Sequence, residues 1–140
     1  MSWMEKRRRA LMAAAQTPPL VLDPVFANND WAAIIAACQR RQVPDTWAVG
    51  DRKSMDIGGA AYTIDIIGKN HDSYADGSGL APLTLQMHEC DGMFYKMDTS
   101  GLNTAGWKES YIRSTVMPAL LEKLPGEVKA AVREVSKQTG

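Results

Sequence analysis

The stretch from Asn103 to Arg113 contains the side chains best suited to bind a ligand. If a helix begins near Asn103, then Trp107, Ser110 and Arg113 follow at three-residue steps and lie roughly on one face. An aromatic ring, a hydroxyl and a guanidinium on one face suit the recognition of sugars or carboxylates. The competing interpretation, which we favour, buries Trp107 in the core and pairs Arg113 with backbone carbonyls or with Asp51.

Two further groups contain side chains that metal ions or catalysis could use. His71 and Asp72 lie in a glycine-rich polar stretch, and His88 and Cys90 follow a segment that alternates apolar and polar residues. Imidazole, carboxylate and thiolate are ligands that zinc accepts, but zinc sites usually have closely paired ligands such as C-x-x-C. We therefore predict no metal and no cofactor, and expect His71 and Asp72 to be turn residues that bond the loop backbone.

Nucleophilic catalysis requires a hydroxyl or thiol beside a base and an orienting group. Cys90, either histidine and Asp72 supply these types, but no spacing in the sequence places them together. The sequence also lacks a nucleophile elbow, a phosphate-binding loop and a dinucleotide-binding fingerprint. These observations predict a non-enzymatic protein with no catalytic residues.

The composition narrows the classes of partner. The chain has 140 residues, of which 45% are hydrophobic, so one domain with a real core can form. The 16 basic and 16 acidic residues balance, which argues against a specific nucleic-acid partner. No apolar run approaches the ~20 residues of a membrane span, so we expect no membrane partner. Cys38 and Cys90 lie far apart in the sequence and are expected to be reduced thiols.

The amino-terminal segment is predicted to be an amphipathic helix from Ser2 to Gln16. Ser2 and Glu5 have the spacing of a capping box, and Thr17 precedes two prolines that end the helix. A helix of this length is marginal in isolation, so it needs a surface to lie on. We predict that this surface belongs to another molecule. The predicted assembly interface consists of Trp3, Met4, Arg7, Leu11 and Met12.

The remaining sequence predicts an α+β fold with a small, mainly antiparallel sheet, amino- and carboxy-terminal helices and long loops. Residues 1–19 form the amphipathic arm, and residues 20–140 form a single α+β domain. A second helix is expected to be capped by Asn28 or Asn29, and another to begin near Asn103 and to be interrupted at Pro118. A short strand that enters a turn is expected at 47–51, and further strands are expected at 61–67 and 83–88. We also expect a turn at Gly58-Gly59, loops at 68–80 and 90–102, and a last helix from Pro125.

Several short motifs occur in an order and spacing that resemble a known family. The family is an uncharacterised domain, a domain of unknown function, that is common in bacteriophage and prophage genes of gut bacteria. The similarity covers about residues 44–138, and Asn103–Arg113 also resembles a piece of the formylglycine-generating-enzyme and C-type-lectin-like folds. Longer members continue with further strands where this chain stops at Gly140, so a ligand site built from both halves would be incomplete. The motifs are Trp47–Asp51, Ile66–Asp72, Asn103–Arg113, Leu124-Pro125 and Val135–Lys137.

The resemblance implies a virion protein of the tail, baseplate, fibre or capsid decoration, made in the cytoplasm of the bacterial host. Its implied partners are other virion proteins and further copies of the chain in a homo-oligomer, with the amino-terminal helix as the attachment element. One alternative is a module that binds a host-surface receptor or glycan through the loops 68–82 and 91–106 with Trp107. Another is a truncated relative of a formylglycine-generating-type or metal-binding enzyme.

Overall fold

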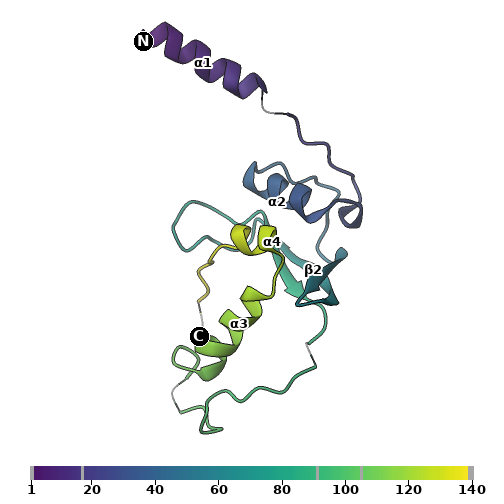
Figure 1. Cartoon of the computed structure of the whole chain (residues 1–140), viewed down its shortest axis with the longest axis vertical. Coiled ribbons are helices and arrows are strands. Elements are labelled where there is room, and N and C mark those ends of the chain that lie inside the picture. Colours follow the sequence, from purple (N-terminus) through teal and green to yellow (C-terminus); the bar gives the residue numbers. More distant parts are fainter. Residues whose placement is uncertain (1, 17, 91, 105, 139–140) are drawn as a thin grey trace.

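The computed structural model describes residues 2–16, 18–90, 92–104 and 106–138, and it has an α+β fold (Figure 1). A small antiparallel sheet forms the centre of a body, and one helix stands away from that body. The predicted fold class is therefore confirmed. The helices are α1 (Trp3–Gln16), η1 (Phe26–Asn28), α2 (Trp31–Gln39), η2 (Ile112–Val116), α3 (Met117–Glu122) and α4 (Gly126–Ala131); the strands are β1 (Arg52–Ile57), β2 (Ala60–Lys69) and β3 (Leu83–Met87).

The three strands follow one another in the order β1-β2-β3, and both pairs are antiparallel. Gly58 and Gly59 join β1 to β2 in the predicted turn, with φ angles of +63° and +89°. A two-residue hairpin turn with positive φ at both positions matches the twist of the strands, and glycine adopts it without a steric penalty. The register of β2 against β3 shifts between Ile66 and Gly68, which marks a β-bulge.

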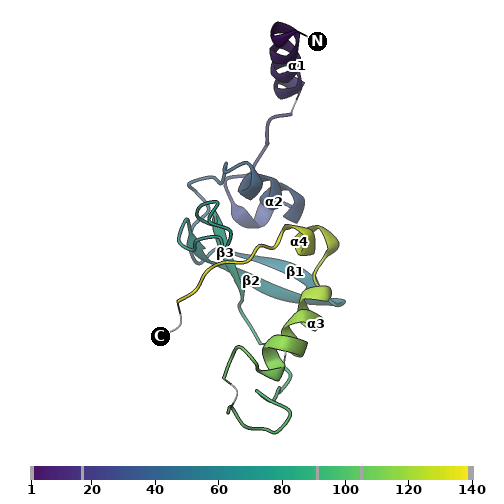
Figure 2. The ribbon, with the colours of Figure 1, turned by 90° about the vertical axis from the view of Figure 1, so that its left-hand side faces the viewer.

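The two faces of the sheet have different environments because side chains alternate along each strand. Figure 2 shows α2 and α4 near the sheet. One face is apolar: it packs against Val128 of α4 and against Trp31 and Ile35 of α2. The opposite face is polar and largely open to solvent. The buried sheet residues are Met55, Ile57, Ile64 and Ile66.

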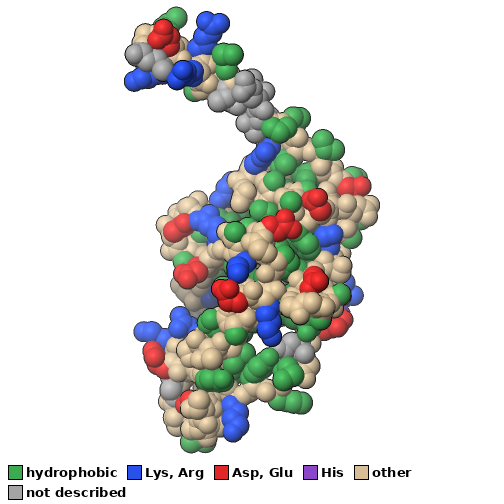
Figure 3. Space-filling model, in the orientation of Figure 1, with side chains coloured by type: hydrophobic (Ala, Val, Ile, Leu, Met, Phe, Trp, Pro, Cys, Tyr) green, Lys and Arg blue, Asp and Glu red, His purple; other side chains and the backbone are tan. Residues whose placement is uncertain are grey.

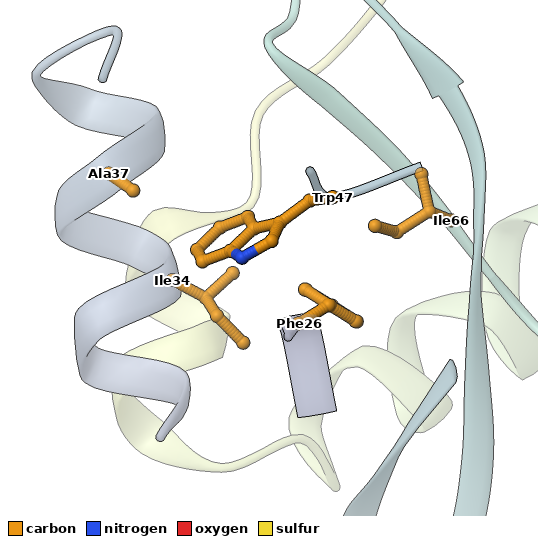
Figure 4. Close-up of a cluster of buried hydrophobic side chains, with 5 residues drawn as sticks. All are labelled: Phe26, Ile34, Ala37, Trp47 and Ile66. Carbon is orange, nitrogen blue, oxygen red and sulfur yellow. The ribbon is translucent and has the colours of Figure 1, made fainter. Parts of the chain in front are cut away.

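A second cluster of buried side chains surrounds Trp47, which is fully buried (Figure 4). Its ring meets Phe26 of η1 at a centroid distance of 5.4 Å, and its indole Nε1–H donates to the Asp23 carbonyl at 2.9 Å. Ile34 of α2 and Ile66 of β2 close the cluster. Trp47 therefore joins α2 to the sheet.

Of the short strand and turn predicted at 47–51, the strand is wrong and the turn is present. Asp51 accepts a hydrogen bond from the Ala48 N–H at 2.9 Å through its carboxylate, and its own N–H donates to the Ala48 carbonyl at 3.0 Å. Gly50 has a φ of +99°. These bonds close a turn, so the first strand begins only at Arg52.

The predicted cap of α2 is also wrong, because Asp30 rather than Asn28 or Asn29 occupies that position. The Asp30 carboxylate accepts the Ala33 N–H at 2.7 Å. Asn29 is buried, where its amide accepts from the Asp23 N–H at 2.8 Å and donates to nearby carbonyls. Asn29 thus stabilises the chain segment that leads into α2.

The carboxy-terminal helix begins at Tyr111 and not near Asn103, as predicted. Residues 104 and 106–109 form turns, and Gly106 has a φ of +69°. The helix opens with the wider π-helical turn η2, which ends directly before Met117-Pro118. Proline lacks an N–H and its ring clashes with the carbonyl four residues earlier, so a wide turn accommodates it and the helix continues.

Candidate functional site

The helix α1 forms as the sequence predicts, with reciprocal capping at its start. The Glu5 N–H donates to Ser2 Oγ at 3.2 Å, and the Ser2 N–H donates to Glu5 Oε2 at 3.0 Å. The predicted capping box is therefore confirmed. Figures 1 and 2 both show α1 separated from the body by an extended segment. Thr17, which was predicted to contribute to the helix end, and positions 91 and 105 of the predicted loop 91–106 lie outside the described residues.

The large apolar side chains that the structure describes on α1 are open to solvent. Trp3, Met4, Leu11 and Met12 have exposed fractions between 54% and 73%. The guanidinium of Arg7 lies over the Trp3 ring, 5.4 Å from its centroid, so it is on the same face. Large apolar and aromatic side chains with an arginine are typical of protein interface cores. The structure thus brings the five predicted assembly residues onto one exposed helix.

The segment that follows α1 is bound to the body from Pro18 onward. The Arg40 guanidinium donates to the Pro18 carbonyl at 2.8 Å, and Leu20 and Leu22 pack against the cluster around Trp47. The part of the chain that stands away from the body therefore lies before Pro18.

The predicted ligand face in 103–113 does not form. Ser110 is only 1% exposed, and its hydroxyl donates to the Trp107 carbonyl at 2.8 Å and accepts the Arg113 N–H at 3.2 Å. The serine caps the following helix, so its hydroxyl is not available to a ligand. Asn103 is exposed and precedes the helix.

The core interpretation of Trp107 is wrong, because this side chain is 52% exposed. Arg113 does bind a carbonyl, as that interpretation proposed: its Nη1 donates to the Lys108 carbonyl at 3.1 Å. Its partner is this neighbouring backbone and not Asp51. Trp107 therefore remains accessible while Arg113 and Ser110 hold the turn that presents it.

Replacing Ser110 with alanine is expected to destabilise the protein by about 1 kcal/mol, the typical cost of losing a helix cap. Ser114→Ala is the matched control, because Ser114 lies on the same helix with an exposed side chain. Urea unfolding of both variants measures the difference. Equal stability of the two variants would contradict the capping role of Ser110.

A second group of exposed apolar side chains lies in the segment between β3 and the carboxy-terminal helix, in or beside the loop that the sequence offered, together with Trp107, as an alternative ligand-binding region. Phe94 is fully exposed, and Leu102 and Trp107 are more than half exposed. We call these three residues the distal surface. Their segment is at the end of the molecule opposite α1 in Figure 1, and hydrophobic side chains are visible at that end in Figure 3.

His71 and Asp72 have different environments although they are adjacent. His71 is exposed, with its Nδ1 3.3 Å from the Asp72 carboxylate. Asp72 is buried and binds Lys137 Nζ at 2.5 Å and the Thr84 hydroxyl at 2.6 Å. The bonds from Lys137 and then Thr84 lower the pKa of Asp72 from 3.8 to about 2. Its side chain thus joins distant segments, rather than bonding the loop backbone as predicted.

A second set of contacts joins the same loop to the chain end. The Arg133 guanidinium stacks 3.9 Å from the centroid of the Tyr74 ring and pairs with Asp76. Its Nη2 also donates to Ser78 Oγ at 3.1 Å. Hydrogen bonds from Ser78, followed by the charge of Arg133, lower the pKa of Asp76. We call Asp72, Lys137, Tyr74, Arg133 and Asp76 the carboxy-terminal clasp.

The open face of the sheet contains a charged group that the sequence did not predict. His88 Nδ1 lies 2.7 Å from the Asp65 carboxylate, which also pairs with Arg52 Nε at 3.0 Å. The three residues come from successive strands or their ends, since Arg52 is opposite Asp65 and the His88 N–H donates to the Thr63 carbonyl. Strand alternation was a usable signal for placing Asp65 on the polar face.

In the described residues, His88 and Cys90 do not belong to a set of side chains that could bind zinc. Within residues 2–16, 18–90, 92–104 and 106–138, three or more His, Cys, Asp or Glu side chains do not gather in a metal-binding arrangement. Burial raises the pKa of the Cys38 thiol to about 11, which disfavours the thiolate form that binds metals. Both cysteines are free thiols. None of the described helices has the length and apolar character needed to cross a membrane.

Comparison of the chain with protein-family models, with curated proteins and with solved structures gives no match.

Proposed function

We propose that the protein is a non-enzymatic structural component of a bacteriophage virion that assembles through α1. The observation that carries the assembly role is the solvent exposure of the apolar face of α1. The motifs that resemble the phage domain support the virion context, as part of a tail, baseplate, fibre or capsid decoration. The partners are other virion proteins and further copies of the chain.

Free-energy considerations support docking of the arm. A 14-residue helix has marginal stability alone, and its reciprocal cap stabilises only the first turn. Complete burial of a leucine or methionine side chain contributes roughly 1.5–3 kcal/mol. Leu11, Met4 and Met12 together with Trp3 can therefore stabilise both the helix and a complex when a partner covers them.

Charged groups border the apolar face and suit the rim of an interface. Lys6, Arg8 and Arg9 are exposed on α1, while Glu5 takes part in the capping box. The aliphatic stem of Arg7 extends the apolar surface beside Trp3 while its charge stays accessible. This arrangement of an apolar centre with a polar rim is typical of protein–protein interfaces.

Deletion of residues 1–17 tests the proposal. The body should unfold with a free energy within about 0.5 kcal/mol of the full chain, because the deletion removes no described contact of the core. Incorporation into particles should fall by at least about tenfold, because interface anchors are lost. The measurement is the amount of tagged protein in purified particles from the producing strain.

A double substitution separates loss of the apolar face from loss of chain length. Trp3→Ala with Leu11→Ala should reduce incorporation as the deletion does, whereas Val21→Ala, at an exposed residue after the arm, should not. Normal incorporation of the deleted chain would reject an assembly role for α1.

A further inference from the structure

We infer that α1 of one copy docks on the distal surface of a second copy, so that the chains associate head to tail. The inference rests on the proposed function, because it takes α1 to be the assembly interface and names its partner. Two features of the chain carry it: the opposite charges of its two parts, and the positions of its two exposed apolar surfaces.

The charge distribution disfavours contact between two arms and favours contact between an arm and a body. Residues 1–19 contain four basic residues and one acidic residue, whereas residues 20–140 contain 12 basic and 15 acidic residues. Two copies of α1 laid side by side would bring like charges together, which costs free energy. The body of another copy has the opposite net charge and attracts the arm.

The apolar residues of the body determine where the arm docks. Phe94, Leu102 and Trp107 form the distal surface, and the exposed charges of that segment include both Lys108 and Glu109. Because these charges have both signs, they do not attract the basic arm to this particular place. Apolar contact therefore determines where the arm docks, and the net charge favours the body of another copy as its partner. Trp3 and Leu11 of α1 offer side chains of matching character.

The arm and the segment between β3 and η2 that contains the distal-surface residues lie at opposite ends of the molecule, with the body between them, in both Figure 1 and Figure 2. A contact between these two surfaces in different copies is heterologous, and it leaves one arm and one distal surface available for further copies. Repetition produces a ring or a filament. A single helix face is small beside the roughly 1,200–2,000 Å² of a standard interface, so each contact is expected to be weak.

Two complementary variants test the head-to-tail contact. The first, Trp3→Ser with Leu11→Ser, keeps the distal surface and loses the arm face. The second, Phe94→Ser with Trp107→Ser, keeps the arm and loses the distal surface. All four positions are exposed, and circular dichroism verifies that both variants are folded.

Analytical ultracentrifugation gives the decisive measurement. The full chain should form species larger than dimers as its concentration rises, and each variant alone should remain monomeric. An equimolar mixture of the two variants should form a one-to-one heterodimer, with a dissociation constant at least about tenfold lower than that of either variant with itself. Salt should weaken this heterodimer because it screens the attraction between arm and body.

The outcomes separate this inference from the proposed function. A monomeric mixture, together with loss of incorporation on arm deletion, overturns the second copy as the partner and leaves the assembly role intact. Self-association of the Phe94→Ser, Trp107→Ser variant as strong as that of the full chain also overturns the inference, because the distal surface is then not needed. Normal incorporation without the arm rejects both.

Discussion

Replacement of Trp47 by alanine is expected to lower the free energy of unfolding by about 3–5 kcal/mol. The side chain is fully buried between Phe26, Ile34 and Ile66, so its removal leaves a cavity between α2 and the sheet. The change also leaves the Asp23 carbonyl without its indole donor. A domain has only about 5–15 kcal/mol of stability in total, so this loss is a large share.

Trp107→Ala provides a matched control, because the chemical change is the same and the side chain is half exposed. We expect the control to cost less than about 1 kcal/mol. Trp47→Phe should be destabilised less than Trp47→Ala and keeps the comparison measurable if the alanine variant is unfolded. Urea titrations provide all three values. A loss at Trp107 as large as that at Trp47 would contradict the assignment of these tryptophans to surface and core.

Acidification from pH 4 to pH 2 is expected to remove the stabilisation that Asp72 contributes through the carboxy-terminal clasp. The pKa of Asp72 is about 2 in the folded protein, compared with its ordinary value of 3.8, because Lys137 and Thr84 bond its ionised form. A folded-state pKa below the unfolded value means that the stabilisation is complete above pH 3.8 and decreases as pH falls through 2. Protonation ends the charge pairing with Lys137, so the chain end then loses a contact with the loop.

Asp72→Asn isolates this contribution. Urea unfolding between pH 7 and pH 2 should show the wild type more stable than Asp72→Asn above about pH 4, with the gap narrowing at lower pH. Asp45→Asn, at an exposed loop position, should follow the wild-type curve. A gap between wild type and Asp72→Asn that is constant over the whole range would show that the ionisation of Asp72 does not stabilise the fold.

Patterns that depend on neighbouring residues predicted much of the fold. The strand formers of 61–67 and the alternation of 83–88 gave β2 and β3 close to the observed bounds, and Gly58-Gly59 gave the turn that precedes β2. Alternation works because successive side chains of a strand face opposite environments. The α+β class followed from these segments and the flanking helices.

Errors arose where side-chain hydrogen bonds compete with a regular element. Trp47–Asp51 contains strand formers, but the Asp51 carboxylate closes a turn and the indole of Trp47 enters the core. In 103–110, the turn at Gly106 and the cap at Ser110 delay the helix by several residues. Intrinsic helix and strand propensities do not account for such side-chain hydrogen bonds.

The sequence shows the charged residues of the body, but it does not predict which of them pair with one another. Asp72 binds Lys137, 65 positions away in the chain, and Asp65 binds His88, 23 positions away. Such pairs depend on strand register and on the return of the chain end past the loop. A local pattern contains neither piece of information.

The amino-acid sequence by itself determined the arm as a capped amphipathic helix, because Ser2 and Glu5 bond each other within one turn and two prolines follow it. Only the tertiary structure decided that this helix stands away from the body and that Trp107 is exposed. The physical reason is the distance along the chain that separates the interacting residues. Capping and helical periodicity involve residues within one or two turns, whereas exposure depends on which distant segments occupy the core, where Trp47, Phe26 and Ile66 already fill the space beside α2.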